Sequence, residues 1–405
     1  MSAFIKKTKI LYITYDGMME SIGSSQILPI IKKLSKNNHM HILSFEKKED
    51  IKSKEYMSEL KKLNKNNVIW IALRYWSYPK TIATMANIIK GAIICCYLII
   101  IKKVRIIHIR SSMPGLLVAP FIRIFRLKIL YDMRGFWADE KVDRYGWNNK
   151  GLYYKFFKKL EENLILKSER IICLTNHSIK ILNKKFPQVN RNKFICIPTC
   201  SDESNFKLRK KYIRTRKKNI IFGYLGTVKL AYNFEKVIFL FSKLLNLDKN
   251  IKIRIFNKGS HNHIRRIMKK YKIPKNSFQI KFVERKRIHR EISTIDLGIF
   301  YLNTNYSINA SFPTKIAEFF LSGKPIICNP FNNDIINLFK KNQVGISYDF
   351  KETNYRNFLK KIRKMISNKK TILTCREIGE KKYSLSFAAK NYNLIYQGIN
   401  LRNEN

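Results

Sequence analysis

The stretch Ser311–Ile327, SFPTKIAEFFLSGKPII, decides the fold of this 405-residue chain. It predicts a helix that begins at Pro313 and ends at Gly323, followed by a β-rich run. Lys315 and Glu318 are three residues apart, so a helix places them on one face. A cation and a carboxylate at a helix entrance suit a sugar nucleotide: Lys315 faces the diphosphate and Glu318 accepts hydrogen bonds from ribose hydroxyls. An ordinary surface helix with an ion pair is the alternative.

The composition is that of a globular protein with a strongly basic surface. Hydrophobic residues make up 45% of the chain and aromatic residues 13%, which excludes a disordered protein and allows two or three domains. The count of 80 Lys and Arg against 28 Asp and Glu gives a net charge of +52. Such a charge favours anionic lipid headgroups, nucleic acid or phosphorylated substrates. Lysine is spread along the whole chain, however, so a compositional background is the alternative and the charge alone identifies no partner.

Cysteine and histidine spacing predicts no metal site. The seven cysteines are an odd number in apolar surroundings, as expected of reduced core residues in a cytosolic protein. Cys196 and Cys200 are separated by three residues, but no second Cys or His pair follows them, and the histidines form no HExxH-type set. We therefore expect no metal.

One short apolar run is a candidate for membrane contact. The N-terminus, MSAFIKKTK, has no long apolar core and no cleavage site, so no signal peptide is expected. Gly91–Ile101 is shorter than the roughly 20 apolar residues that a spanning helix needs. It predicts a buried helix, or else a helix that lies in the membrane surface. The basic neighbours that would then reach the headgroups are Lys90, Lys102, Lys103 and Arg105.

The first half of the chain alternates β-rich runs with helical segments. This alternation predicts a parallel sheet that is covered on both faces and binds ligands at the carboxyl ends of its strands. The predicted strands are 9–14, 39–47, 68–73, 105–110, 128–132, 170–175 and 193–200, and the predicted helices include 82–101 and 111–126.

A glycine-bearing loop, YDGMMESIGSSQ, follows the first predicted strand. It has no GxGxxG pattern, so a dinucleotide-binding fingerprint is absent. Gly23, Ser24 and Ser25 would allow backbone N–H groups to approach a phosphate or an acceptor at the start of the next helix. A plain turn between strand and helix is the alternative.

A second polar cluster follows the strand at 128–132. The segment DMRGFWADEKVDRYGW, residues 132–147, contains three Asp, one Glu, two Arg and two Trp. We expect a ligand-binding loop, because strand-end loops of this class carry ligands and a surface rich in Trp and Arg suits sugar and phosphate. A solvated loop with buried aromatic residues is the alternative. Asp132, Arg134 and Arg110 would collect along the same sheet edge.

A dense charge run at 207–218 breaks the periodicity and predicts a domain boundary. Beyond it the pattern restarts with a strand and a glycine turn, IIFGYLGTV, and continues through strands and helices into the stretch quoted first. The fold class is therefore α/β, with two doubly wound domains and a cleft between them.

Five segments in this order resemble the family 4 glycosyltransferases of the GT-B fold, over nearly the whole chain. They are YDGMMESIGSSQILPII, YDMRGFWADE, ICIPTCSDESNF, IIFGYLGTVKLAYNFE and SFPTKIAEFFLSGKPII. The resemblance implies two Rossmann-like domains that face a cleft. These would be an acceptor-binding domain at 1–205, a basic linker at 206–218, a nucleotide-sugar-binding domain at 219–382 and a helix at 383–405 that crosses back to the first domain.

The resemblance also implies roles for single residues. Glu318 matches the second glutamate of the family's E-x7-E motif, which holds the ribose, and Ala310 stands where the first glutamate is expected. Lys229 and Lys315 match positions expected at the diphosphate. The residues expected in catalysis are Asp132, Arg134, Lys229 and Lys315; those expected to bind the donor nucleotide are Gly226, Thr227, Pro313, Thr314, Lys315 and Glu318; and the first-domain residues expected to face donor or acceptor are Gly23, Ser24, Ser25, Arg110 and Glu140.

The function implied is a retaining glycosyltransferase, EC 2.4, that moves a sugar from a nucleotide diphosphate-sugar to an acceptor hydroxyl without a metal or other cofactor. A lipid-linked or saccharide acceptor, a role in cell-surface polysaccharide synthesis, peripheral contact with an anionic membrane at its cytoplasmic face and no nucleic acid partner are the accompanying expectations. A nucleotide-sugar epimerase, a basic nucleic-acid-binding protein and an inactive membrane scaffold are the alternatives. Neither the donor sugar nor its base follows from the sequence.

Overall fold

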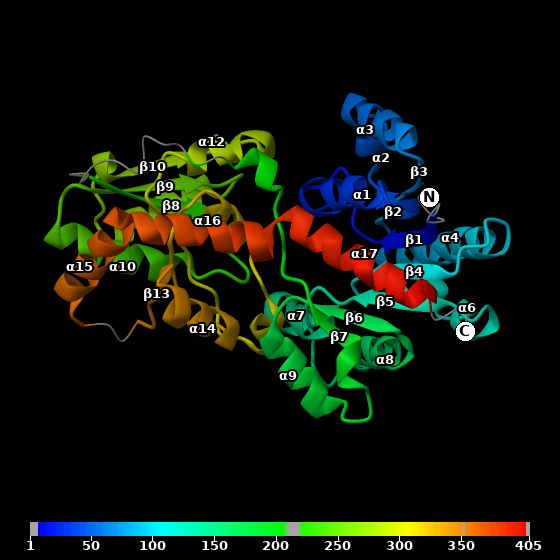
Figure 1. Ribbon diagram of the computed structural model, residues 1–405. Helices are drawn as coiled ribbons and strands as arrows, with labels where there is room; N and C mark the ends of the chain where they lie inside the picture. Colours follow the sequence, from blue (N-terminus) through cyan, green and yellow to red (C-terminus); the bar gives the residue numbers. More distant parts are fainter. Residues whose placement is uncertain (1–6, 207, 209–218, 351–352, 402–405) are drawn as a thin grey trace, which may run out of the picture. The chain divides into compact units, whose positions relative to one another are not determined.

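The computed structural model of the protein describes residues 7–206, 208, 219–350 and 353–401 (Figure 1). Chain contacts divide it into two compact units. Unit 1 consists of Met1–Pro198 and Leu385–Asn405, and unit 2 of Thr199–Ser384. The basic linker expected at 206–218 lies almost wholly outside the described residues.

Unit 1 is built on a parallel sheet with the strand order β3-β2-β1-β4-β5-β6-β7. Its strands are short runs rich in Ile and Leu, and strands such as β1, β4 and β5 are largely buried, as expected of strands covered on both faces. The order reverses between β1 and β4, which is where doubly wound sheets bind ligands. The strands are β1 (Thr8–Thr14), β2 (Asn38–Glu46), β3 (Val68–Arg74), β4 (Ile106–Arg110), β5 (Lys128–Asp132), β6 (Arg170–Cys173) and β7 (Phe194–Cys196).

Helices connect these strands, and the last helix of the chain belongs to the same unit. Helix α17, drawn in red in Figure 1, packs against α1, β1 and β4. Asn393 on α17 accepts a hydrogen bond of 2.7 Å from the side chain of Asn38 at the start of β2. The helices are η1 (Gly23–Ile27), α1 (Leu28–Leu34), α2 (Lys48–Ile51), α3 (Lys54–Lys65), α4 (Lys80–Ile100), α5 (Gly115–Val118), α6 (Phe121–Ile124), α7 (Trp137–Tyr145), α8 (Leu152–Lys167), α9 (Asn176–Lys185), η2 (Arg191–Lys193) and α17 (Leu385–Leu401).

Two segments of unit 1 differ from the sequence prediction. The helix predicted at 111–126 is two short helices, α5 and α6, because Pro120 has no backbone N–H to continue the first one. The loop predicted at 132–147 contains the helix α7. Its start carries Asp139 and Glu140, which suit the positive end of a helix dipole, and Gly146 ends it in the left-handed conformation, φ 69°.

Helix α4 is longer than the apolar run that suggested it. It spans 21 residues, and its length and composition are sufficient for a membrane span. Only 33% of its most apolar 18-residue segment is buried. The expectation of a buried helix that is too short to cross a membrane is therefore wrong for this segment.

Unit 2 repeats the architecture with a second parallel sheet, in the order β10-β9-β8-β11-β12-β13. Here the order reverses between β8 and β11. The strands are β8 (Ile220–Leu225), β9 (Ile251–Phe256), β10 (Phe278–Lys281), β11 (Leu297–Ile299), β12 (Ile326–Cys328) and β13 (Gly345–Ser347). The helices are η3 (Glu203–Asn205), α10 (Phe234–Leu247), α11 (His261–Lys270), η5 (Lys275–Ser277), η6 (Arg285–Arg287), α12 (Ile288–Ile292), η7 (Tyr306–Ala310), α13 (Thr314–Leu321), α14 (Asn333–Asn342), α15 (Tyr355–Ser367) and α16 (Lys369–Tyr383).

The stretch quoted at the start forms the centre of unit 2. Helix α13 begins after Pro313, and Gly323 ends it with a left-handed φ of 66°. Every residue from Lys315 to Leu321 is buried, so α13 is a core helix and the alternative of an ordinary surface helix is wrong. The predicted α/β architecture, with two Rossmann-like doubly wound units, is confirmed.

Candidate functional site

A glycine turn follows β8 at the point where the strand order of unit 2 reverses. Gly226 has a φ of 90°, a conformation that residues with a side chain rarely adopt, and its N–H donates to the carbonyl of Phe256 at 2.9 Å. Asn257, which follows β9, donates its side-chain amide to the Gly226 carbonyl at 2.9 Å. The amide oxygen of Asn257 also accepts the N–H of Ser260 at 2.7 Å. Two neighbouring strand ends are thus tied together.

Lys315 points its ammonium group into aromatic rings beside this turn. The Nζ atom lies 3.8 Å from the ring centroid of Tyr232, 4.9 Å from that of Tyr224 and 5.3 Å from that of Phe300. A Cβ atom placed on Gly226 would be 3.9 Å from Nζ, so the ammonium faces the glycine turn. Within the described part of the chain, this buried nitrogen has no hydrogen-bond partner.

The environment of Lys315 changes its protonation. Burial lowers the pKa of the Lys315 ammonium to about 7, although the Glu318 carboxylate acts in the opposite direction. Cation–π contacts stabilise the charged form without replacing the lost hydration. A buried ammonium without hydrogen bonds, next to an open glycine turn, is the arrangement that an anion would complete.

Glu318 is buried one helical turn further along α13 and pairs with Arg285 of η6. It does not form an ion pair with Lys315 among the described contacts, although the sequence places the two on one face. The Arg285 side chain is 43% exposed, so it can move away when a ligand needs the carboxylate. Glu318 can therefore accept hydrogen bonds from a polyhydroxyl group in exchange for Arg285.

The other predicted residues of unit 2 lie in the turn after β8 or at the start of α13. Lys229 and Thr227 are exposed in the turn after β8, where the Thr227 hydroxyl accepts the Lys229 N–H at 3.3 Å. Pro313 is the N-cap of α13, and Thr314 is the first residue of the helix. Ala310 is buried at the end of η7, so this position supplies no carboxylate.

Unit 1 gathers charges at the equivalent reversal of its own sheet. Arg110 ends β4, Asp132 ends β5, and Arg134 follows with a left-handed φ of 55°. Both guanidinium groups lie near the carboxylate, at 3.7 Å for Arg110 and 3.8 Å for Arg134. Both also donate to the amide oxygen of Gln26, at 2.8 and 3.2 Å. The predicted neighbours Arg110, Asp132 and Arg134 are therefore brought together.

Two tyrosines of α17 complete this cluster from the other end of the chain. The Tyr392 hydroxyl donates to Asp132 at 3.0 Å, and His108 Nδ1 lies 2.6 Å from the Tyr396 hydroxyl. Burial alone would raise the pKa of Asp132, but Arg134, His108 and Arg110 together lower it to about 2. Asp132 is thus a permanent anion that holds the two arginines at the sheet edge.

The predicted loop at Gly23 is the start of a helix with a π-helical turn. Gly23 is required there, because a Cβ atom would lie 2.1 Å from the carbonyl oxygen of Gly17. The Ser24 hydroxyl bonds to the Glu20 carbonyl at 2.8 Å, and the Ser25 hydroxyl bonds to the Ser21 carbonyl at 2.6 Å. The loop contributes Gln26 to the cluster of arginines.

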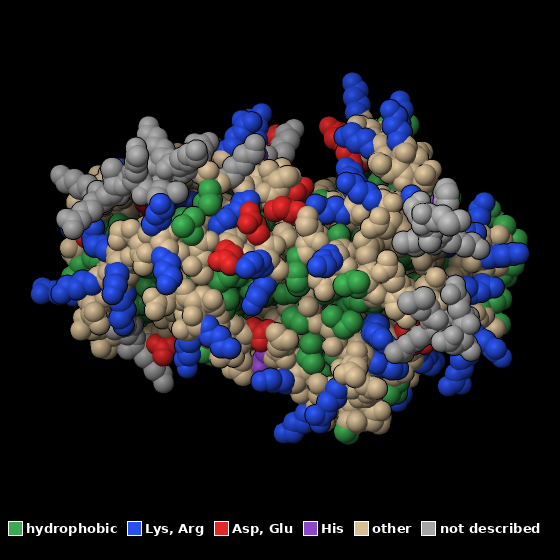
Figure 2. Space-filling model, viewed as in Figure 1, with side chains coloured by type: hydrophobic (Ala, Val, Ile, Leu, Met, Phe, Trp, Pro, Cys, Tyr) green, Lys and Arg blue, Asp and Glu red, His purple; other side chains and the backbone are tan. Residues whose placement is uncertain are grey.

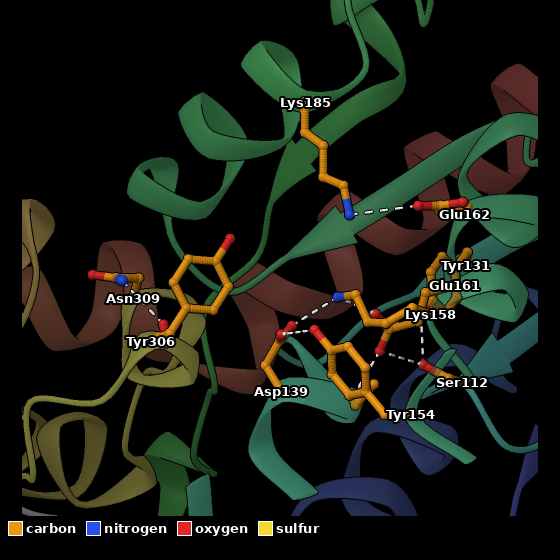
Figure 3. A network of polar contacts seen from close by, with 11 residues as sticks. Ser112, Tyr131, Asp139, Tyr154, Lys158, Glu161, Glu162, Lys185, Tyr306 and Asn309 are labelled. Carbon is orange, nitrogen blue, oxygen red and sulfur yellow. Dashed lines mark hydrogen bonds and ion pairs between the residues drawn. The ribbon is translucent and has the colours of Figure 1, made fainter. Parts of the chain in front are cut away.

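Glu140 lies on α7, where its carboxylate pairs with Arg144. The contacts described do not join it to the cluster of Asp132 and Arg134. A buried network fixes α7 to α8, as Figure 3 shows. Lys158 points between two carboxylates and bonds to Asp139 at 2.7 Å and to Glu161 at 2.9 Å. Glu161 in turn accepts the Ala138 N–H of α7 at 2.9 Å. The network holds the segment that carries Arg134.

Several members of both clusters are not among the residues that the sequence predicts for the site. Tyr224, Tyr232 and Phe300 come from separate segments, and no local spacing connects them to α13. Tyr392 and Tyr396 do carry a signal, since residues four apart share one face of a helix. Within the ranges described, no group of three or more His, Cys, Asp or Glu side chains could hold a metal ion.

Residues 205–383 match the family described as Glycosyl transferases group 1. The solved structures that resemble nearly the whole chain include the following three. A glycosyltransferase from Rickettsia africae ESF-5 is 15% identical with a TM-score of 0.67, and the match covers 97% of this chain and 98% of that one. Anabaena Alr3699/HepE in complex with UDP is 10% identical with a TM-score of 0.67, over 96% of this chain and 100% of that one.

The third is a sucrose-phosphate synthase from Thermosynechococcus elongatus, 10% identical with a TM-score of 0.72, and the match covers 98% of this chain and 100% of that one. A search among curated proteins finds no match to the sequence. The match over residues 205–383 supports the predicted enzyme class, a glycosyltransferase of EC 2.4, and the structures confirm the GT-B fold.

Proposed function

We propose that this glycosyltransferase transfers a sugar from a nucleotide diphosphate-sugar to an acceptor hydroxyl, with retention at the anomeric carbon. The observation that carries the proposal is the buried Lys315 ammonium, which has no hydrogen-bond partner in the described chain and faces the Gly226 turn. Anabaena Alr3699/HepE, which has a similar fold, has been solved in complex with UDP and with UDP-glucose, and this supports a sugar nucleotide as the donor.

In this proposal unit 2 binds the donor. The diphosphate lies against the Gly226 turn, where Lys315 and the exposed Lys229 stabilise the negative charge that develops as the bond to the anomeric carbon breaks. Glu318 accepts hydrogen bonds from the ribose after Arg285 has moved away. Cationic side chains then stabilise the charge of the leaving group, so the proposed reaction requires no metal.

Unit 1 binds the acceptor in this proposal. Arg110 and Arg134 present guanidinium groups at the edge of the sheet, held in place by Asp132. We propose a lipid-linked or saccharide acceptor in the synthesis of a cell-surface polysaccharide, with the enzyme at the cytoplasmic face of the membrane. The basic charge of the chain supports a surface that attracts anionic lipid.

A binding and turnover assay tests the proposal. Purified protein is screened by thermal shift against UDP, GDP, ADP and dTDP and their glucose conjugates, because a ligand that binds only the folded state raises the melting temperature. We expect one base to be preferred, and we expect Lys315→Ala and Glu318→Ala to lose that shift. Lys340→Ala, a change at an exposed lysine of α14, is the matched control and should keep it.

Two outcomes would contradict the proposal. One is the absence of a shift with every nucleotide, and the other is a shift that Lys315→Ala leaves unchanged. Conversion of the sugar nucleotide to an isomer without an acceptor would instead identify an epimerase.

A further inference from the structure

Helix α4 exposes an apolar stripe along its whole length. The stripe consists of Ile82, Met85, Ile89, Ile93, Tyr97 and Ile100, whose spacings of three or four residues put them on one face. All six are exposed, Ile82 by 67% and Ile93 by 62%. Outward faces of surface helices ordinarily carry charged and polar side chains. A contiguous apolar face of this kind marks an interaction site.

The opposite face of α4 fixes the helix to unit 1. The buried Asn87 accepts the N–H of Trp76 at 3.1 Å and donates to its carbonyl at 2.8 Å. Gly91 approaches α5 so closely that a Cβ atom would lie 2.4 Å from Leu117. The stripe is therefore held outward by packing on the other side.

The connections of α4 prevent it from crossing a bilayer while the sheet is intact. Strand β3 ends at Arg74 and β4 begins at Ile106, and both belong to one parallel sheet. The links 75–79 and 101–105 each reach about 17 Å when extended. If α4 crossed the membrane, one of these links would have to cross a core about 30 Å thick to return to the sheet. Neither link is long enough to do so. The helix can only lie along a surface.

Basic and aromatic residues stand at the ends of the stripe. Lys80 begins the helix, and the exposed Lys102 and Lys103 follow it. Trp76 is 43% exposed, and the Lys90 ammonium lies 3.4 Å from its ring centroid. Figure 2 shows Lys and Arg side chains bordering hydrophobic ones at the edge of the view where α4 lies. Aromatic rings and lysines that border an apolar face suit the headgroup region of a bilayer.

We propose that α4 docks unit 1 onto an anionic lipid bilayer, with the stripe among the acyl chains and Lys80, Lys102 and Lys103 at the headgroups. A second copy of the chain fits the stripe less well, because each copy carries a net charge of +52 and the two would repel. The proposal deepens the membrane location proposed above, but it is independent of the donor chemistry of unit 2.

Vesicle binding of the full chain tests the docking. Wild-type protein is floated with vesicles of phosphatidylcholine alone and of phosphatidylcholine mixed with phosphatidylglycerol. We expect binding to the anionic vesicles that weakens with added salt. Ile89→Ser combined with Ile93→Ser should weaken it at least about tenfold, because both side chains are exposed in the free protein and buried in the bilayer.

The matched control is Leu373→Ser combined with Leu394→Ser, which removes two exposed leucines from α16 and α17 and should bind vesicles like the wild type. Nucleotide-induced thermal shifts should be the same in all three proteins, so that failed docking and failed donor binding can be told apart. The proposal is wrong if the wild type ignores anionic vesicles or if the isoleucine variant binds them undiminished. It is also wrong if light scattering shows a wild-type dimer that the isoleucine variant dissociates.

Discussion

The ammonium nitrogen of Lys315 lies 3.8 Å from the ring centroid of Tyr232, buried and without a hydrogen-bond partner in the described structure. A protein gains little stability from such a group, because burial removes the hydration that an ammonium needs. The arrangement favours the binding of a ligand at the expense of the stability of the free protein.

Lys315→Met should make the protein more stable while it abolishes donor binding. The thioether side chain fills a similar space without the desolvation cost, and we expect unfolding in urea to require about 1–4 kcal/mol more. The lysine has a pKa of about 7 in the folded state, below its usual 10.5, so the unfolded state binds more protons between these values. The gain should therefore be complete near pH 7 and disappear as the pH approaches 10.5. A less stable variant would contradict this assignment.

Donor affinity should fall as the pH rises above 7. A bound diphosphate raises the pKa of Lys315 again, so binding takes up a proton wherever the free protein has lost it. The dissociation constant should increase about tenfold per pH unit above 7, until the pKa of the complex is reached. Calorimetry with the intact sugar nucleotide in buffers of different ionisation enthalpy measures the uptake. If the dissociation constant of Lys315→Arg depended on pH as that of the wild type does, the assignment of this proton to Lys315 would be wrong.

Gly226→Ala should destabilise unit 2 and weaken donor binding. The φ of 90° at this residue is strained for alanine, at a cost of about 1–2 kcal/mol. The added Cβ atom would also approach the Lys315 ammonium at 3.9 Å, where the ligand is expected. Gly259→Ala is the control, because a Cβ atom there meets nothing within 4 Å. Thermal unfolding with and without nucleotide compares the two, and equal effects would exclude the special role of Gly226.

Asp132→Asn should destabilise unit 1 far more than Tyr392→Phe. The asparagine leaves Arg110 and Arg134 without their buried counter-charge, which costs about 3–5 kcal/mol. The phenylalanine removes one hydrogen bond, worth about 1 kcal/mol. Because the folded pKa of Asp132 is about 2, against 3.8 ordinarily, its contribution is present above pH 3.8 and is lost as the pH falls toward 2. Urea unfolding at neutral and acid pH measures both, and an acid sensitivity that Asp132→Asn retains in full would refute the linkage.

Lys158→Met should unfold the α7 segment or destabilise it by about 3–5 kcal/mol, since Asp139 and Glu161 lose the cation that both contact. Lys159→Met is the neighbouring control. The Lys159 side chain is 71% exposed and lies 3.7 Å from Glu162, so its loss should cost less than about 1 kcal/mol. Hydrogen exchange of the α7 amides reports the difference, and equal protection in the two variants would rule out the anchoring role.

The sequence predicts the two sheets well, because buried parallel strands such as β1 and β5 contain continuous runs of Ile, Leu and Tyr with little ambiguity. It also places Gly226 and the start of α13 correctly, since a glycine turn and a proline are local signals.

Long-range contacts were beyond the sequence argument. The three-residue spacing of Lys315 and Glu318 suggests an ion pair, but Glu318 pairs with Arg285, 33 positions earlier in the sequence, and Lys315 turns to aromatic rings. Likewise, the strand-end position of Asp132 predicts the neighbouring arginines, whereas Tyr392 reaches it from 260 residues away. Local spacing predicts which residues share one face of a helix. It does not predict which distant residues pack against that face.

The place of α17 has a consequence for synthesis on the ribosome. Strands β1 to β7 of unit 1 precede unit 2 in the chain, yet the core of unit 1 needs Tyr392 and Tyr396, which are translated only after unit 2. Unit 2 is one continuous segment and is fully synthesised first. The nascent chain must therefore hold an unfinished first sheet, with His108 and Asp132 uncovered, until α17 has been translated. Chaperone contact during elongation should then concentrate on strands β1 to β7 rather than on unit 2.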